Sequence, residues 1–167
     1  AFLHGGFLHI LMNGMVLADL GRLCEPLLSS WKFLVAYGLS TLGGAAGSLI
    51  GQRLQHMPAA VGSVGASGAL CGLIGLLLVY SIKERQPEMR DGLVRWIIWM
   101  VILTFSLGGV DHAGHLGGFI AGGAFGLTVT DYTDSRTAPR WRYPGYIVAF
   151  AGVAGLAFAL WSYFEKR

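Results

Sequence analysis

Ser67 and His115 are the two residues of this chain whose types and surroundings best suit catalysis. Ser67 lies in the glycine-flanked segment GASG at residues 65–68, and His115 lies in GHLGG at residues 114–118. A serine hydroxyl is a weak nucleophile near pH 7 and needs an adjacent base, which an imidazole can supply. The pair therefore predicts hydrolysis by a serine nucleophile with His115 as the base.

A second polar pair, His9 and Asn13, lies near the start of the sequence. Residues four apart share one face of a helix, so this spacing permits the two side chains to act together. Each polar residue also has a plainer interpretation. A lone serine among glycines in a membrane helix, such as Ser67, is usually a small packing residue.

The composition indicates a membrane protein. Of the 167 residues, 54% are hydrophobic and 13% are charged, and the mean hydropathy is +0.58. Soluble domains carry roughly 25% charged residues. A glycine inside a helix in water costs up to about 1 kcal/mol, whereas glycines in lipid allow helices to pack closely, which suits the 26 glycines here. A soluble fold of this size could not bury so much apolar surface.

Six apolar stretches predict an all-α fold, a polytopic bundle of transmembrane helices. Most approach the roughly 20 residues that a helix needs to cross a bilayer, and the fourth is somewhat short. Short polar segments connect them, so the whole chain, 1–167, is predicted to form a single membrane domain. The predicted spans are residues 5–23, 31–50, 64–82, 93–107, 113–129 and 146–163.

The basic residues predict the orientation of this bundle. Lys and Arg concentrate on the cytoplasmic side of membrane proteins. Nine of the 12 lie on the side of the connectors after the first, third and fifth spans, and three lie on the other side. The first side is therefore expected in the cytoplasm, and the chain is expected to be a multi-pass protein of the cell membrane. The net charge of +3 follows from this topology and requires no nucleic-acid partner.

The first, third and fifth spans then start at the outer side of the membrane. His9, Ser67 and His115 lie about 3 to 5 residues inside these spans, or roughly 5–8 Å at the helical rise. Polar residues within membrane helices are costly unless they pair or line a wet cavity. We therefore expect one shared site that opens to the non-cytoplasmic side.

The third and fifth spans both carry glycines at four-residue intervals. These are Gly68 and Gly72 in the third span, and Gly114, Gly118, Gly122 and Gly126 in the fifth. Because small residues let helix backbones approach closely in lipid, the two glycine faces are predicted to pack together. Such a contact would bring Ser67 within hydrogen-bond distance of His115.

Three motifs, in this order, resemble those of the rhomboid intramembrane serine proteases. They are HGGFLHILMN at residues 4–13, GASGA at residues 65–69 and HAGHLGG at residues 112–118. The resemblance covers nearly the whole chain. It implies a rhomboid-like helical fold, transmembrane proteins as substrates within membrane lipid, and no cofactor or metal ion.

The resemblance also implies a role for each matching residue. Ser67 would be the nucleophile and His115 the general base, a dyad without the third carboxylate of the Ser-His-Asp triad. The predicted activity is that of a serine endopeptidase that cuts in or near transmembrane segments. The residues implied to stabilise the oxyanion or the substrate are His9, Asn13, Gly65 and Ala66.

The chain departs from the rhomboid pattern in two places. Rhomboids have another membrane span before the HGGFLHILMN segment, which starts here at residue 4, so we expect an N-terminally truncated sequence. The catalytic helices would occupy 1–130, and 131–167 would form a cytoplasmic connector and an extra C-terminal span. Cys71 lies four positions after Ser67, where rhomboids often have an aromatic residue that stacks on the base.

The remaining polar residues near the motifs are expected to have supporting roles. His4 and His112 are expected to support the loops at the outer ends of their spans. Asp111 is expected to cap a helix by accepting hydrogen bonds from free backbone N–H groups. Cys24 and Cys71 should lie at different depths, so no disulfide is predicted.

Other chemistries fit the sequence less well. The His-Glu-x-x-His string of a metalloprotease is absent. Asp19 and Asp111 lie near opposite ends of their helices, which argues against an aspartyl protease. A metal site would have to combine four histidines without an obvious carboxylate or thiolate ligand. Those histidines are His4, His9, His112 and His115.

Two alternatives from other functional classes stay open. A catalytically inactive rhomboid-like protein could bind membrane clients for trafficking or quality control, although such a protein would be expected to lose the dyad. A channel or transporter would also place polar residues inside the membrane. Its polar residues should continue to the cytoplasmic side, whereas those here cluster in the outer half.

Overall fold

A computed structural model describes residues 7–54, 66–106, 110–129 and 138–165 of the chain. All regular secondary structure in these segments is α-helical. The backbone of His9 lies within the first helix, but its side chain is not described.

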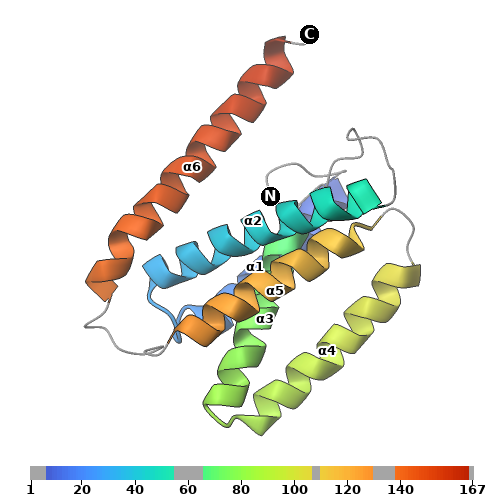
Figure 1. The fold of residues 1–167 in the computed structure, drawn as a ribbon, viewed down its shortest axis with the longest axis vertical. Helices are drawn as coiled ribbons and strands as arrows, with labels where there is room; N and C mark the ends of the chain where they lie inside the picture. Colours follow the sequence, from blue (N-terminus) through green and yellow to red (C-terminus); the bar gives the residue numbers. More distant parts are fainter. Residues whose placement is uncertain (1–6, 55–65, 107–109, 130–137, 166–167) are drawn as a thin grey trace.

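Six helices follow one another along the described segments (Figure 1). They are α1 (Phe7–Cys24), α2 (Ser30–Leu54), α3 (Ser67–Lys83), α4 (Pro87–Ser106), α5 (His112–Thr128) and α6 (Ala138–Glu165). Each helix overlaps one of the predicted apolar spans. The prediction of an all-α helical bundle is therefore confirmed.

Two helices begin well before their predicted spans. α4 begins at Pro87 rather than at residue 93, and α6 begins at Ala138 rather than at residue 146. Hydropathy marks only the apolar part of a helix, whereas backbone hydrogen bonding can continue into polar flanks. Proline is favoured in a first helical turn because an N–H at that position would have no partner within the helix, which explains the start of α4. Residues 93 and 146 were predicted as the starts of apolar spans, and the helices that contain these spans begin 6 and 8 residues earlier.

The surface of the bundle has the character of a membrane protein. Among the described helices, only α2 is both long and apolar enough to cross a membrane by a simple test of length and hydropathy, and α3 is apolar but shorter. Large apolar side chains nevertheless cover the outer surface, where Phe150 is 77% exposed, Trp99 is 70% exposed and Ile147 is 69% exposed. Such an apolar surface is unfavourable in water and suits a lipid environment.

α3 is the central helix of the bundle. All of its residues from 69 to 77 are buried, and it packs against α1, α2, α4 and α5. In Figure 1, α2 and α5 run side by side in opposite directions across α3. A helix that is apolar on all sides must be buried on all sides, which explains the central position of α3.

Glycines form the contact between α3 and α5. A Cβ atom added to Gly118 would collide with the backbone carbonyl oxygen of Gly68, and one added to Gly122 would collide with that of Gly72. The two backbones are thus in direct contact at these points, which a residue with a side chain would prevent. The four glycines of the predicted α5 face are all buried. This face lies against α3.

α2 adds a third glycine surface, which the sequence analysis did not identify. A Cβ atom on Gly44 would lie 3.3 Å from the carbonyl oxygen of Gly114 and 3.3 Å from Cα of Gly68. One on Gly47 would collide with the carbonyl oxygen of Ala113. The signal for this surface is the small-residue run GGAAG at residues 43–47. α2, α3 and α5 together form a tightly packed unit, named here the glycine core.

α6 lies at the edge of the bundle. Its N-terminal half packs against α2, where the rings of Tyr146 and Trp31 have centroids 4.6 Å apart. Trp141 also meets Phe125 of α5 edge to face at 5.5 Å. Toward its C-terminus α6 leans away from the other helices (Figure 1).

Gly118→Leu is expected to destabilise the protein. The new side chain would collide with the Gly68 carbonyl, so α3 and α5 would have to separate, and overpacking of this kind costs about 1–3 kcal/mol or more. The melting temperature in detergent should fall clearly. Gly155→Leu in α6 is the matched control because a Cβ atom there meets nothing within 4 Å. Equal melting temperatures for the two variants would contradict the glycine contact.

Candidate active site

Ser67 is the first residue of α3. Ala66, which is buried, is the N-cap residue, with φ −82° and ψ −3°, and its carbonyl accepts a hydrogen bond from the N–H of Leu70 at 3.0 Å. The N–H groups in the first turn of a helix have no partner within that helix. The serine hydroxyl therefore lies beside backbone donors that are suited to binding negative charge.

His115 lies in the first turn of α5. Asp111 caps this helix, because its Oδ1 accepts a hydrogen bond from the N–H of Gly114 at 2.8 Å. The carbonyl of Asp111 accepts another from the N–H of His115 at 3.0 Å. The capping role predicted for Asp111 is confirmed, and it fixes the start of the helix that carries His115.

Ser67 and His115 are hydrogen-bonded to each other across α3 and α5. Ser67 Oγ lies 2.8 Å from His115 Nε2, and both residues are half-buried. In the tautomer with the ring proton on Nδ1, the serine hydroxyl donates to Nε2. This is the arrangement that a base needs in order to take the proton of a serine.

Glycines next to the pair explain how a short serine side chain reaches a residue of another helix. A Cβ atom on Gly68 would lie 3.3 Å from the carbonyl oxygen of Gly114. The backbones of α3 and α5 are therefore already close beside Ser67 and His115, and they stay in contact farther along at Gly118 and Gly122. A larger residue at Gly68 would press against both α5 and α2, whereas one at Gly114 would collide with the side chain of Asp111.

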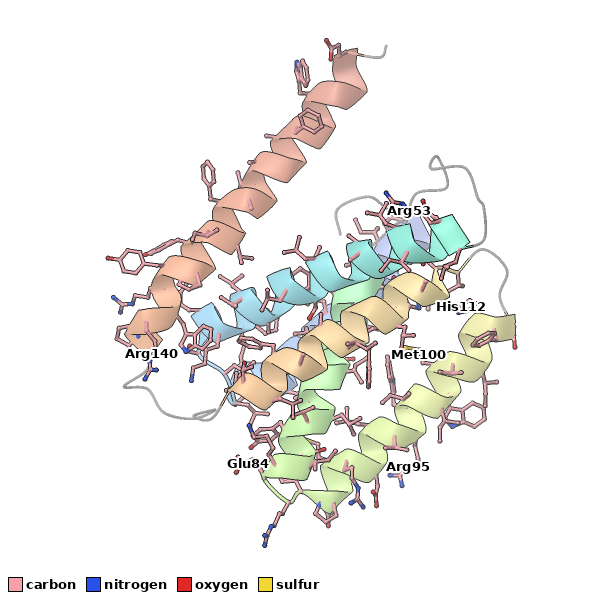
Figure 2. The ribbon with its side chains drawn as sticks, in the orientation of Figure 1. Arg53, Glu84, Arg95, Met100, His112 and Arg140 are labelled. Atoms are coloured by element: carbon pink, nitrogen blue, oxygen red, sulfur yellow. The ribbon has the colours of Figure 1, made fainter. Side chains whose placement is uncertain are left out.

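The pair lies at one end of the bundle. Figure 2 shows Arg53, near the end of α2, and His112, at the start of α5, at this end. Glu84 lies at the opposite end, where α3 passes into α4 (Figure 2).

Asn13 is buried within α1, a helix that packs against α3. Its Nδ2 atom is enclosed and forms no hydrogen bond with the part of the chain that the structure describes. A buried amide donor without a hydrogen bond costs about 1–3 kcal/mol. The side chain of His9 and the whole of Gly65, both predicted to act with Asn13, lie outside the described residues.

Cys71 is buried one helical turn after Ser67. Its Sγ lies 4.0 Å from Sδ of Met100 on α4, which Figure 2 labels. The position where rhomboids often have an aromatic residue thus holds a thiol that packs against α4. Cys71 and Cys24 are both free thiols.

His112 stacks on Phe105 at the end of α4. The ring centroids are 4.2 Å apart and the planes differ by 9°. His112 therefore joins the end of α4 to the start of α5, a contact that the sequence did not predict.

The described residues contain no group of three or more His, Cys, Asp or Glu side chains placed to hold a metal ion. The hypothetical metal site would use four histidines. His4 and the side chain of His9 lie outside the part of the chain that the structure describes.

An apolar cavity of about 410 Å³ lies between α1, α3 and α4. Its lining includes Leu20, Ile74 and Trp96. Ile74 follows Ser67 by about two helical turns, or roughly 10 Å along α3. The cavity is therefore separate from the Ser67–His115 pair.

Comparison with known proteins identifies related sequences. The family model of the Rhomboid domain matches residues 1–132. Similar curated proteins include Rhomboid-like protease 5 of Toxoplasma gondii, 34% identical over 84% of this chain, and RHOMBOID-like protein 5 of Arabidopsis thaliana, 32% identical over 87%. Rhomboid-type serine protease 2 of Emericella nidulans is 34% identical over 77%.

The chain spans only part of each of these relatives. The matches cover 16%, 47% and 25% of their respective lengths. No solved structure matches the chain.

The family match includes every motif on which the resemblance was based. Residues 1–132 contain all of α1 to α5, and therefore both Ser67 and His115. Rhomboids are integral membrane proteins, which agrees with the apolar outer surface of the bundle. The family model and the identity shared with curated rhomboid proteins show that this chain belongs to the rhomboid family.

Proposed function

We propose that this chain is an intramembrane serine endopeptidase that hydrolyses peptide bonds in or near the transmembrane segments of other proteins. The observation that carries this proposal is the hydrogen bond of 2.8 Å between Ser67 Oγ and His115 Nε2. Two of the similar curated proteins are named proteases, which supports the same class of activity.

The proposed reaction uses His115 as base and then as acid. Ser67 Oγ attacks the carbonyl carbon of the scissile bond while His115 Nε2 takes the serine proton. The C–N bond breaks as the imidazolium returns this proton to the leaving amine. A water molecule, deprotonated by His115, then attacks the carbonyl carbon of the acyl-serine ester. The ester C–O bond breaks as the imidazolium returns this proton to Ser67 Oγ, which releases the new carboxyl end and free Ser67.

The oxyanion of the tetrahedral intermediate needs preorganised donors. The first-turn N–H groups of α3 start at Ser67 itself, and they point toward the N-terminal side of the helix. The buried Nδ2 of Asn13, which forms no hydrogen bond with the described residues, is a second donor. We assign His9 to the same role from the family resemblance.

The proposed substrate must expose a peptide bond at the depth of the dyad. A transmembrane helix hides its carbonyl groups in backbone hydrogen bonds, so it has to unwind locally before Ser67 can attack. Small or helix-breaking residues near the cleavage site should therefore be preferred.

From the distribution of Lys and Arg, we place the dyad on the non-cytoplasmic side of a cell membrane.

The main alternative is a rhomboid-like protein that binds membrane clients without cleaving them. The hydrogen-bonded pair of Ser67 and His115 favours the enzyme, because a client-binding protein needs no base beside a serine. A fluorophosphonate probe separates the two functions, since it reacts covalently only with an activated serine.

Ser67→Ala is expected to abolish proteolysis of a transmembrane substrate and labelling by a fluorophosphonate. The melting temperature in detergent should change little, because the loss of one hydroxyl at the start of α3 leaves almost no cavity. Both measurements use purified protein, with the wild type as the reference. Cleavage that persists in Ser67→Ala would rule out the dyad.

His115→Ala is expected to be as inactive as Ser67→Ala. The double variant should be no worse than either single variant, because the members of a catalytic unit act together. His112→Ala is the control, since His112 lies one turn away and stacks on Phe105, and it should retain measurable turnover. A reversed ranking of the two histidines in a cleavage assay would show that the base was assigned wrongly.

Asn13→Ala is expected to lower kcat by roughly 10- to 1,000-fold with little change in KM, which is the range for the loss of one oxyanion donor. The melting temperature should change little, because the Nδ2 of Asn13 forms no hydrogen bond with the described residues that the substitution would break. An effect confined to KM, or a clear loss of stability, would instead assign Asn13 to substrate binding or to packing.

A further inference from the structure

α3 and α5 are joined by polar contacts at both of their ends. At one end, Ser67 is hydrogen-bonded to His115. At the other end, the Nζ of Lys83, the last residue of α3, donates to backbone carbonyl oxygens at the end of α5. These oxygens belong to Val129 at 2.6 Å, Gly126 at 3.3 Å and Leu127 at 3.3 Å.

The contact of Lys83 caps α5 from a neighbouring helix. The last carbonyls of a helix have no partner within it and carry the negative end of the helix dipole. An ammonium group has three N–H donors and matches such a cluster of carbonyls in both charge and geometry. Val129 is the C-cap residue of α5, so Lys83 holds the end of this helix.

The backbone around Lys83 is itself fixed. Arg85 has a left-handed φ of 53°, and the N–H of Gln86 donates to the carbonyl of Ser81 at 2.8 Å. The N–H of Arg85 donates to the carbonyl of Ile82 at 3.3 Å. These two bonds form a Schellman motif, which ends α3 sharply and defines where Lys83 lies.

Between the two polar ends, the contact between α3 and α5 consists largely of glycines. Glycine faces allow close approach but carry no side chains that interlock along the helix axis. The Ser67–His115 hydrogen bond cannot hold the axial position throughout a reaction, because it is lost while Ser67 carries an acyl group. The Lys83 contact lies far from the reacting atoms and can persist through every step.

We propose that Lys83 is a positioning residue for the proteolysis proposed above, on which this inference rests. By holding the terminal carbonyls of α5, it fixes the axial register of α5 on α3 and so keeps His115 within reach of Ser67. α5 has 17 residues in a single continuous helix, so a shift at Val129 is transmitted to His115.

The test compares three variants of the complete chain in detergent or lipid. Lys83→Met removes the charge but keeps a long side chain, and Lys83→Arg keeps both. Arg95→Met removes a positive charge from α4 and controls for net charge. We expect Lys83→Met to lower kcat roughly 5- to 20-fold with KM unchanged, since a displacement well under 1 Å already weakens catalysis. Lys83→Arg should recover most of this loss, and Arg95→Met should match the wild type.

Hydrogen exchange supplies a readout that does not depend on activity. If Lys83 sets the register, Lys83→Met should accelerate amide exchange at the distant start of α5, in residues 112–118, as well as near Val129. Faster exchange confined to the end of α5 would overturn the proposal, because Lys83 would then be only a local cap. A wild-type kcat in Lys83→Met, or an equal loss in Arg95→Met, would also overturn it.

Failure of the proposed function would look different from failure of this inference. If the wild type shows neither Ser67-dependent cleavage nor fluorophosphonate labelling, the proteolytic function is wrong. The exchange experiment still decides whether Lys83 controls the position of α5, because it needs neither substrate nor probe.

Discussion

Direct contact between the backbones of α3 and α5 is the constraint on which the rest of this structure depends. Gly118 lies against the carbonyl of Gly68, and Gly122 lies against that of Gly72, so no side chain larger than hydrogen fits at these points. In lipid there is no hydrophobic force between helices, and close van der Waals contact has to hold them together. The same closeness lets the short side chain of Ser67 reach His115.

The pairing of polar groups within the bundle follows from the free-energy cost of burying them without a hydrogen-bond partner. Ser67 and His115 satisfy each other, Asp111 caps α5, and Lys83 caps its other end. The buried Nδ2 of Asn13 and Nε1 of Trp141 are exceptions, because neither forms a hydrogen bond with the described residues. The oxyanion role proposed above for Asn13 would give this donor a partner during the reaction.

The helices outside the glycine core are attached by side chains rather than by backbone contact. α4 meets its neighbours through the Cys71–Met100 and Phe105–His112 contacts, and α6 meets α2 through Trp31 and Tyr146. Side-chain contacts of this kind can rearrange by changes of rotamer, whereas a glycine contact has no side chain whose rotamer could change. The structure thus combines a tightly packed unit that carries the hydrogen-bonded pair of Ser67 and His115 with peripheral helices that expose apolar surface.

Hydropathy, residue type and four-residue spacing are local properties, and they sufficed to predict the six helices and to single out Ser67, His115 and Asn13 as candidate site residues. Only the tertiary structure revealed that α2 closes over the α3–α5 contact, that His112 stacks on Phe105, and that Lys83 caps α5. The starts of α4 and α6 also escaped prediction, since backbone hydrogen bonding does not end where apolar residues do. The contacts of α2, His112 and Lys83 each join residues on different helices. Periodicity along one helix carries no information about which neighbouring helix its face will meet.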